Sequence, residues 1–113
     1  MLKGHKMAPR IKDPLTHARN LAFVRSRAQA KFRGEEWDLT FEEFCHFWST
    51  RQLWAKRGRR IDALILTRRD NEKAWNRNNC CIITRYNQLK AKIELYYGRD
   101  DSEYYMDAIW YKQ

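Results

Sequence analysis

Apolar positions along the chain change their spacing several times, and each spacing predicts a different element. From residue 14 to residue 32 they recur three or four positions apart, which is typical of a helix. Asp13 followed by Pro14 predicts where this helix begins, because aspartate caps a helix and proline fits its first position. Gly34 is expected just beyond its end. Arg19, Arg25, Arg27, Lys31 and Arg33 occupy much of its other side, where they could hold phosphate or simply face water.

A second helix is predicted after residue 40. Phe41, Phe44, Cys45 and Trp48 are spaced as one apolar face of a helix, so this face is expected to pack into the core. Thr40 and Glu43 fit a capping box at its start.

The stretch from residue 57 to residue 92 predicts a strand, a polar loop, a second strand and a helix. Residues 64–66 form one apolar run, and residues 80–83 form a β-prone run after an Asn-rich loop that contains Trp75. Thr84 is placed to cap a helix that begins at Arg85. Beyond Gly98, acidic residues at 100–103 predict a short final helix.

These elements predict the α+β class. At 113 residues the chain is expected to hold one domain, residues 13–113, preceded by a basic arm at residues 1–12. Within the domain we distinguish a helical lead-in (13–56), a strand–strand–helix unit (57–97) and a C-terminal helical tail (98–113).

The charge is unevenly distributed. The net charge is +9, made of +8 in residues 1–33, −5 in 34–50, +9 in 51–92 and −3 in 93–113. Two basic blocks separated by acidic ones favour a surface that meets a polyanion, although such charge also serves solubility.

Three cysteines, two of them adjacent, do not form a disulfide framework, and reduced thiols favour a cytoplasmic setting. No apolar run has the length of a transmembrane segment, so no membrane partner is expected.

The segment Leu66-Thr67-Arg68-Arg69-Asp70-Asn71, followed by Trp75, Asn79-Cys80, Ile83-Thr84-Arg85 and Gln88, resembles the HNH endonucleases found in phages. The lead-in Arg27–Phe44 also resembles that of small phage HNH proteins, so the likeness covers about residues 18–92. It implies a ββα-metal unit, packed here on the N-terminal helices and the C-terminal helix, and a host cytoplasm as the setting.

The resemblance assigns roles to four residues. The family's general-base histidine falls at Arg68, the asparagine that holds the loop at Asn79, and the third position at Asn87, while Asp70 could hold a Mg²⁺ or Mn²⁺ ion. Asp62 is a second candidate ligand. Arginine cannot act as a base at neutral pH, although it could stabilise charge on a phosphate. We therefore expect a degenerate endonuclease centre.

Binding depends less than cleavage on the missing histidines. Trp75 could stack on a base or insert into a groove of DNA, or it could anchor the loop in the core. The candidates for contacts to nucleic acid, with double-stranded DNA expected, are Arg57, Arg59, Arg60, Arg69, Lys73, Trp75, Arg77, Arg85 and Lys90.

Three hypotheses follow from the sequence. The first is a nucleic-acid-binding HNH-like protein without cleavage. The second is an active, metal-dependent HNH endonuclease that nicks or cuts DNA. The third is a phage protein that binds a host or virion protein.

Overall fold

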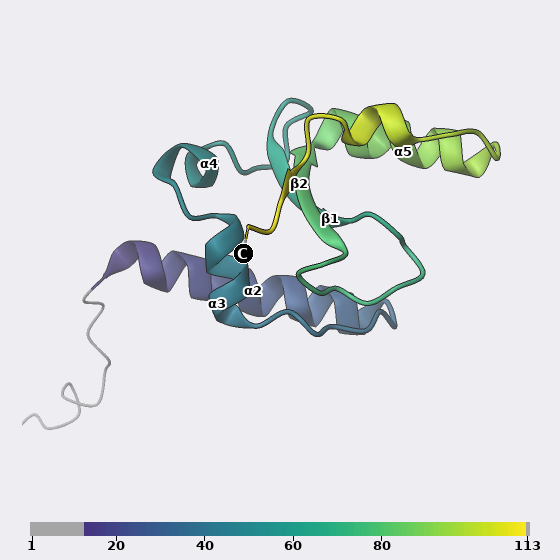
Figure 1. The fold of residues 1–113 in the computed structure, drawn as a ribbon. Coiled ribbons are helices and arrows are strands. Elements are labelled where there is room, and N and C mark those ends of the chain that lie inside the picture. The colour runs from purple at the N-terminus through teal and green to yellow at the C-terminus, as the bar shows by residue number, and fades with distance from the viewer. Residues whose placement is uncertain (1–12, 113) are drawn as a thin grey trace, which may run out of the picture.

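The computed structural model describes residues 13–112, so the predicted basic arm at residues 1–12 lies outside the described part. Figure 1 shows an α+β fold in which helices precede a small antiparallel sheet. The elements are α2 (Pro14–Phe32), α3 (Phe41–Phe47), α4 (Arg51–Ala55), β1 (Leu64–Arg68), β2 (Cys80–Thr84), α5 (Arg85–Tyr96), the 3-10 helix η1 (Ser102–Tyr105) and β3 (Ile109–Trp110).

The three predicted helix starts are confirmed by their capping bonds. Asp13 accepts a hydrogen bond from the Leu15 amide at 3.2 Å, with proline at the first position of α2. Thr40 and Glu43 form the reciprocal capping box at 3.1 and 3.0 Å. Thr84 begins α5 in the same way, so β2 passes directly into the helix.

The sheet contains one strand more than the sequence predicted. β1 and β2 are antiparallel, with Leu64 opposite Thr84 and Arg68 opposite Cys80. β3 then pairs with the other edge of β2 through Ile109. The expected helical tail is therefore confirmed only in part. A short 3-10 helix, η1, forms in the predicted place, with Asp100 accepting bonds from the Ser102 amide and hydroxyl, but residues 109–110 form β3 instead of helix.

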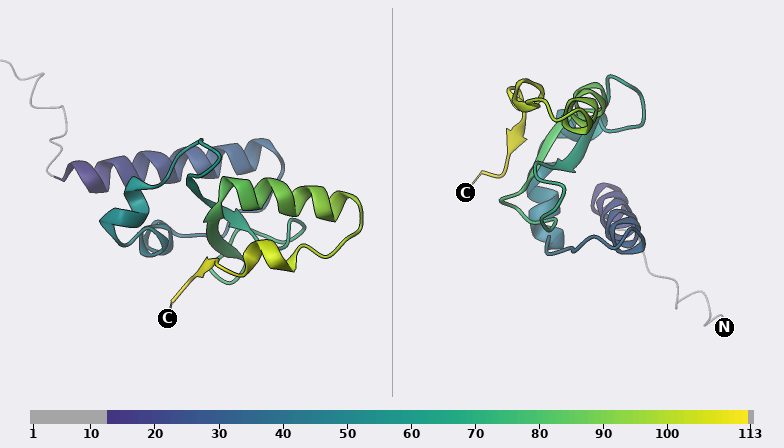
Figure 2. Two further views of the ribbon diagram at one scale, coloured as in Figure 1. Left: turned by 90° about the horizontal axis from the view of Figure 1, so that it is seen from above. Right: turned by 90° about the vertical axis from the view of Figure 1, so that its right-hand side faces the viewer.

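The strands lie between α5 on one side and α2 with α3 on the other (Figure 2). Phe44, Trp48 and Ile82 are almost fully buried in the core on the α2 and α3 side. Cys80 and Cys81, on opposite faces of β2, are both buried as free thiols. Both strand faces are therefore covered, which fits the uninterrupted apolar run of β2.

The loop between β1 and β2 is attached to the segment that follows α2. The Trp75 amide donates to the Glu36 carbonyl at 2.8 Å, and the Asp38 amide donates to the Trp75 carbonyl at 2.7 Å. The rings of Trp37 and Trp75 stack with their centroids 5.3 Å apart. Of the helices in the described residues, none is long and apolar enough to cross a membrane.

Candidate nucleic-acid interface

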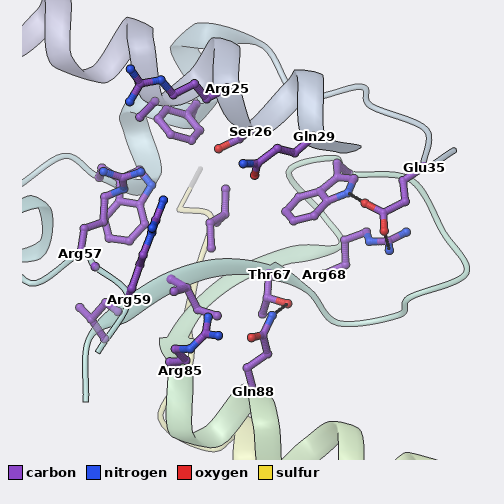
Figure 3. Close-up of a pocket in the computed structure, with 18 of the residues that line it drawn as sticks. Arg25, Ser26, Gln29, Glu35, Arg57, Arg59, Thr67, Arg68, Arg85 and Gln88 are labelled. Carbon is purple, nitrogen blue, oxygen red and sulfur yellow. Dashed lines mark hydrogen bonds and ion pairs between the residues drawn. The ribbon is translucent and has the colours of Figure 1, made fainter. Parts of the chain in front are cut away.

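An open cavity of about 830 Å³ lies between α2 and α5, alongside β1, which is an edge strand of the sheet. We call it the basic groove. Figure 3 shows Ser26 and Gln29 pointing into it from α2, and Arg59 extending into it from the turn before β1. Its charged side chains come from four parts of the chain: Arg25, Arg33, Glu35, Arg57, Arg59, Arg68, Arg85 and Lys92.

The groove carries a strong positive charge. Seven of its lining side chains are lysine or arginine and one is acidic, for a formal charge of +6. Glu35 pairs with Arg33 and Arg68. Within residues 13–112, the other five cations form no ion pair: Arg25, Arg57, Arg59, Arg85 and Lys92. Uncompensated cations on facing walls concentrate a positive potential where an anion can enter.

Arg57 shows how one of these cations is held. Its guanidinium lies over the ring of Trp54 at 4.6 Å and near that of Trp48 at 5.6 Å, which are favourable cation–π distances. Burial lowers the pKa of Arg57, although an arginine stays charged at neutral pH. A cation that is packed on aromatic rings without a carboxylate partner retains its capacity to bind a phosphate.

The other end of the groove is organised by Glu35. Its carboxylate accepts hydrogen bonds from Arg33 at 3.1 and 2.9 Å and from the indole nitrogen of Trp75 at 3.0 Å. It also pairs with Arg68 at 3.0 Å. The hydrogen bonds from Arg33, then that from Trp75 and the charge of Arg68, lower the pKa of Glu35. Glu35 therefore offsets one of the two positive charges at this end of the groove.

Arg68, expected at the place of the general base, is buried at the end of β1. Besides its pair with Glu35, it donates to the Lys73 carbonyl at 2.9 Å and lies 5.4 Å from the ring centre of Trp75. Its guanidinium therefore connects β1 to the loop and the loop to the segment after α2.

Asn79 has the loop-holding geometry that the resemblance implies. Its side-chain oxygen accepts from the Asp70 amide, and its nitrogen donates to the carbonyls of Asp70 and Ala74, each at 3.0 Å. These bonds close the loop between β1 and β2.

The remaining predicted centre residues, Asp70 and Asn87, lie outside the basic groove. The Asp70 carboxylate accepts from the Glu72 amide at 3.0 Å and lies 4.0 Å from the Lys73 ammonium group, on the exposed loop. Asn87 lies in the first turn of α5, where its backbone N–H donates to the Thr84 hydroxyl. Asp70 and Asn87 are both absent from the groove lining.

The residues present do not fit a divalent metal. Among residues 13–112, no group of three or more His, Cys, Asp or Glu side chains could hold a metal ion. Asp62, the second candidate ligand, is exposed and lies 3.4 Å from Arg60. The Asp70 carboxylate is a poor site for Mg²⁺, because the Lys73 ammonium group 4.0 Å away repels a cation and Asp70 belongs to no group of three potential ligands within the described residues.

The predicted nucleic-acid contacts separate into two groups. Arg57, Arg59, Arg85 and Trp75 line the groove. Arg60, Arg69, Lys73, Arg77 and Lys90 do not.

Two of the arginines outside the groove connect parts of the fold. Arg69 forms a bidentate pair with Asp101 at 3.1 and 3.0 Å and lies 4.2 Å from the ring of Tyr105, so it holds the C-terminal segment. Arg77 lies 3.7 Å from Glu43 and packs over Tyr111.

Some groove residues were not among the nucleic-acid contacts that the sequence predicted. Arg25 and Arg33 were expected on the basic side of the first helix, where they could hold phosphate, but Gln29, four positions from each, was missed. Gln88 and Lys92 of α5 lie three and seven positions after Arg85, a helical spacing that could have placed them on its face. Arg19, another arginine of α2, instead donates to the Trp48 carbonyl at 2.6 Å.

No model of a known protein family, no curated protein and no solved structure matches this chain.

Proposed function

We propose that this protein binds nucleic acid in the basic groove and that its HNH-like unit serves as a scaffold without an endonuclease centre. The observation that carries the proposal is the set of five cations that line one groove and form no ion pair with residues 13–112. Phosphate groups are the ligands that such a set of arginine and lysine side chains recognises best.

The HNH-like part of the proposal has its own support. The order of strand, loop, strand and helix agrees with a ββα unit, and the three bonds of Asn79 agree with the role of the family's middle asparagine. Cleavage has less support. Arg68 cannot accept a proton at neutral pH, and its guanidinium is already engaged with Glu35 and the loop.

Adjacent arginines provide a matched test. Arg59 lines the groove, whereas Arg60 is outside it and lies beside Asp62 at the surface. Arg59→Glu and Arg60→Glu change the net charge by the same amount. In fluorescence anisotropy with a labelled oligonucleotide, we expect Arg59→Glu to weaken binding about tenfold, or about 1.4 kcal/mol. Arg60→Glu should stay within about threefold of wild type, because Arg60 lies outside the groove and its charge is already offset by Asp62.

The outcomes distinguish the hypotheses. Equal weakening by both variants would mean that the whole surface attracts the probe and the groove has no special role. No binding at low salt would refute the proposal and favour the protein-binding hypothesis. Nicking of supercoiled plasmid with Mg²⁺ or Mn²⁺, lost in Asp70→Ala, would restore the active endonuclease.

A further inference from the structure

We infer that the basic groove accepts a single strand of nucleic acid rather than a duplex. This inference rests on the proposed function, and it names the class of nucleic acid that the groove takes. The HNH resemblance alone favours double-stranded DNA, so the geometry of the groove leads to a different partner.

The first argument is the position of the cations. They line the groove on more than one side: Arg25 on α2, Arg57 and Arg59 on the turn before β1, and Arg85 and Lys92 on α5. Figure 3 labels the four arginines. A duplex is a rod with phosphates on its outer surface, so it would contact the rims of a groove between two helices. A single strand can enter the groove and bring its phosphates to both walls.

The second argument is the uncharged lining. Leu64 and Leu66 of β1 contribute apolar surface, and Leu21 and Leu89 lie on the two walls with 40% and 38% of their surfaces exposed. A phosphate backbone gains nothing from such surface. Unpaired bases do, because their faces are left without stacking partners outside a duplex.

The third argument is the amide side chains. Gln29 makes no side-chain hydrogen bond with residues 13–112 and points into the groove (Figure 3). Gln88 donates from its nitrogen to Thr67 at 3.3 Å, and among the described residues its side-chain oxygen accepts no bond. An amide can pair with the hydrogen-bonding edge of a base, and that edge is accessible when the base is unpaired.

The experiment compares three DNA probes of equal length in anisotropy titrations at one salt concentration. They are a mixed-sequence single strand, the same sequence as a duplex, and a single strand of abasic sites that keeps the phosphates and lacks the bases. We expect the mixed single strand to bind at least tenfold tighter than either of the others. A tenfold ratio corresponds to about 1.4 kcal/mol, within the range for stacking one base.

Each outcome has one meaning. A duplex that binds as tightly as the single strand would overturn this inference and leave the proposed function standing. An abasic strand equal to the mixed strand would show that the groove holds phosphates alone, and it would also overturn the inference. Failure of all three probes to bind would overturn both proposals.

A substitution of Gln29 tests whether the bases of the strand bind in the groove. Gln29→Ala should reduce the ratio between mixed and abasic strands about threefold or more, because it removes a side chain that faces the bases. Gln52→Ala, on the exposed surface of α4 and outside the groove, is the matched control and should leave the ratio unchanged. An unchanged ratio in Gln29→Ala would contradict the placement of bases in this groove.

Discussion

Glu35 is the residue at which stability and binding are expected to change in opposite directions. Its carboxylate accepts hydrogen bonds from Arg33 and Trp75 and forms an ion pair with Arg68. Glu35→Gln keeps the shape of the side chain, removes its charge and leaves one oxygen to accept bonds in place of two. The substitution should therefore destabilise the fold and leave Arg68 without its ionic partner.

The loss of unfolding free energy in Glu35→Gln depends on which ion-pair partner of Glu35 is buried. The Arg33 side chain is 49% exposed, so losing its pair costs little. The Arg68 side chain is only 10% exposed, and breaking a buried ion pair from one side costs about 3–5 kcal/mol. Arg68 keeps its bond to the Lys73 carbonyl, so we expect the lower end, about 3 kcal/mol. That loss corresponds to a fall in Tm of about 12 °C for a domain of this size.

The assay is urea unfolding followed by tryptophan fluorescence. Glu36→Gln is the matched control, because Glu36 is exposed and its side chain makes no hydrogen bond or ion pair with residues 13–112. The control should change the free energy of unfolding by less than about 0.5 kcal/mol. An equally small effect of Glu35→Gln would refute the reasoning.

The pH dependence of the free energy of unfolding also tests whether the charge of Glu35 stabilises the fold. The pKa of Glu35 is lowered in the folded protein from its ordinary value of 4.5, so its ionised form stabilises the fold. This contribution is present above pH 4.5 and is lost as the pH falls through the lower folded-state pKa. The difference in stability between wild type and Glu35→Gln should therefore shrink below pH 4.5. A constant difference would show that the charge of Glu35 is irrelevant.

Binding should respond in the opposite sense. Glu35→Gln raises the formal charge of the groove from +6 to +7 and frees Arg68 from its carboxylate. Under conditions where the variant is folded, we expect its affinity for the single-stranded probe to rise about threefold. A fall in affinity would contradict a role in neutralising one end of the groove.

Two further substitutions test parts of the fold. Asn79→Ala removes three hydrogen bonds of the loop, so it should lower the free energy of unfolding by about 2 kcal/mol and speed proteolysis between β1 and β2. Asn78→Ala is the control, because the Asn78 side chain makes no hydrogen bond within the described residues. Equal proteolysis of the two variants would be evidence against the role of Asn79. Arg69→Ala should speed hydrogen exchange around Asp101 and leave nucleic-acid affinity within about twofold, because Arg69 holds the C-terminal segment and is outside the groove. A large loss of affinity would place Arg69 in the interface.

Helix starts were the most predictable features of the fold. The caps at Asp13, Thr40 and Thr84 depend on bonds to amides two or three residues away, so the local sequence contains all that is needed. The third strand was not predictable in this way. Ile109 pairs with Ile82, and nothing in the residues around Ile109 indicates which strand edge is available to it.

In the candidate site, too, some features follow from the sequence and others depend on tertiary contacts. The sequence by itself determined that the chain is basic and where its arginines gather, and its family resemblance implied that Asn79 holds the loop. Only the tertiary structure decided that Asp101 pairs with Arg69 and Glu35 with Arg68, while Arg59 and Arg85 line a groove without an ion pair to any described residue. The physical reason is that ion pairing depends on distance in space. The partners of Arg69 and Arg68 lie more than thirty positions away along the chain, where no local pattern reveals them.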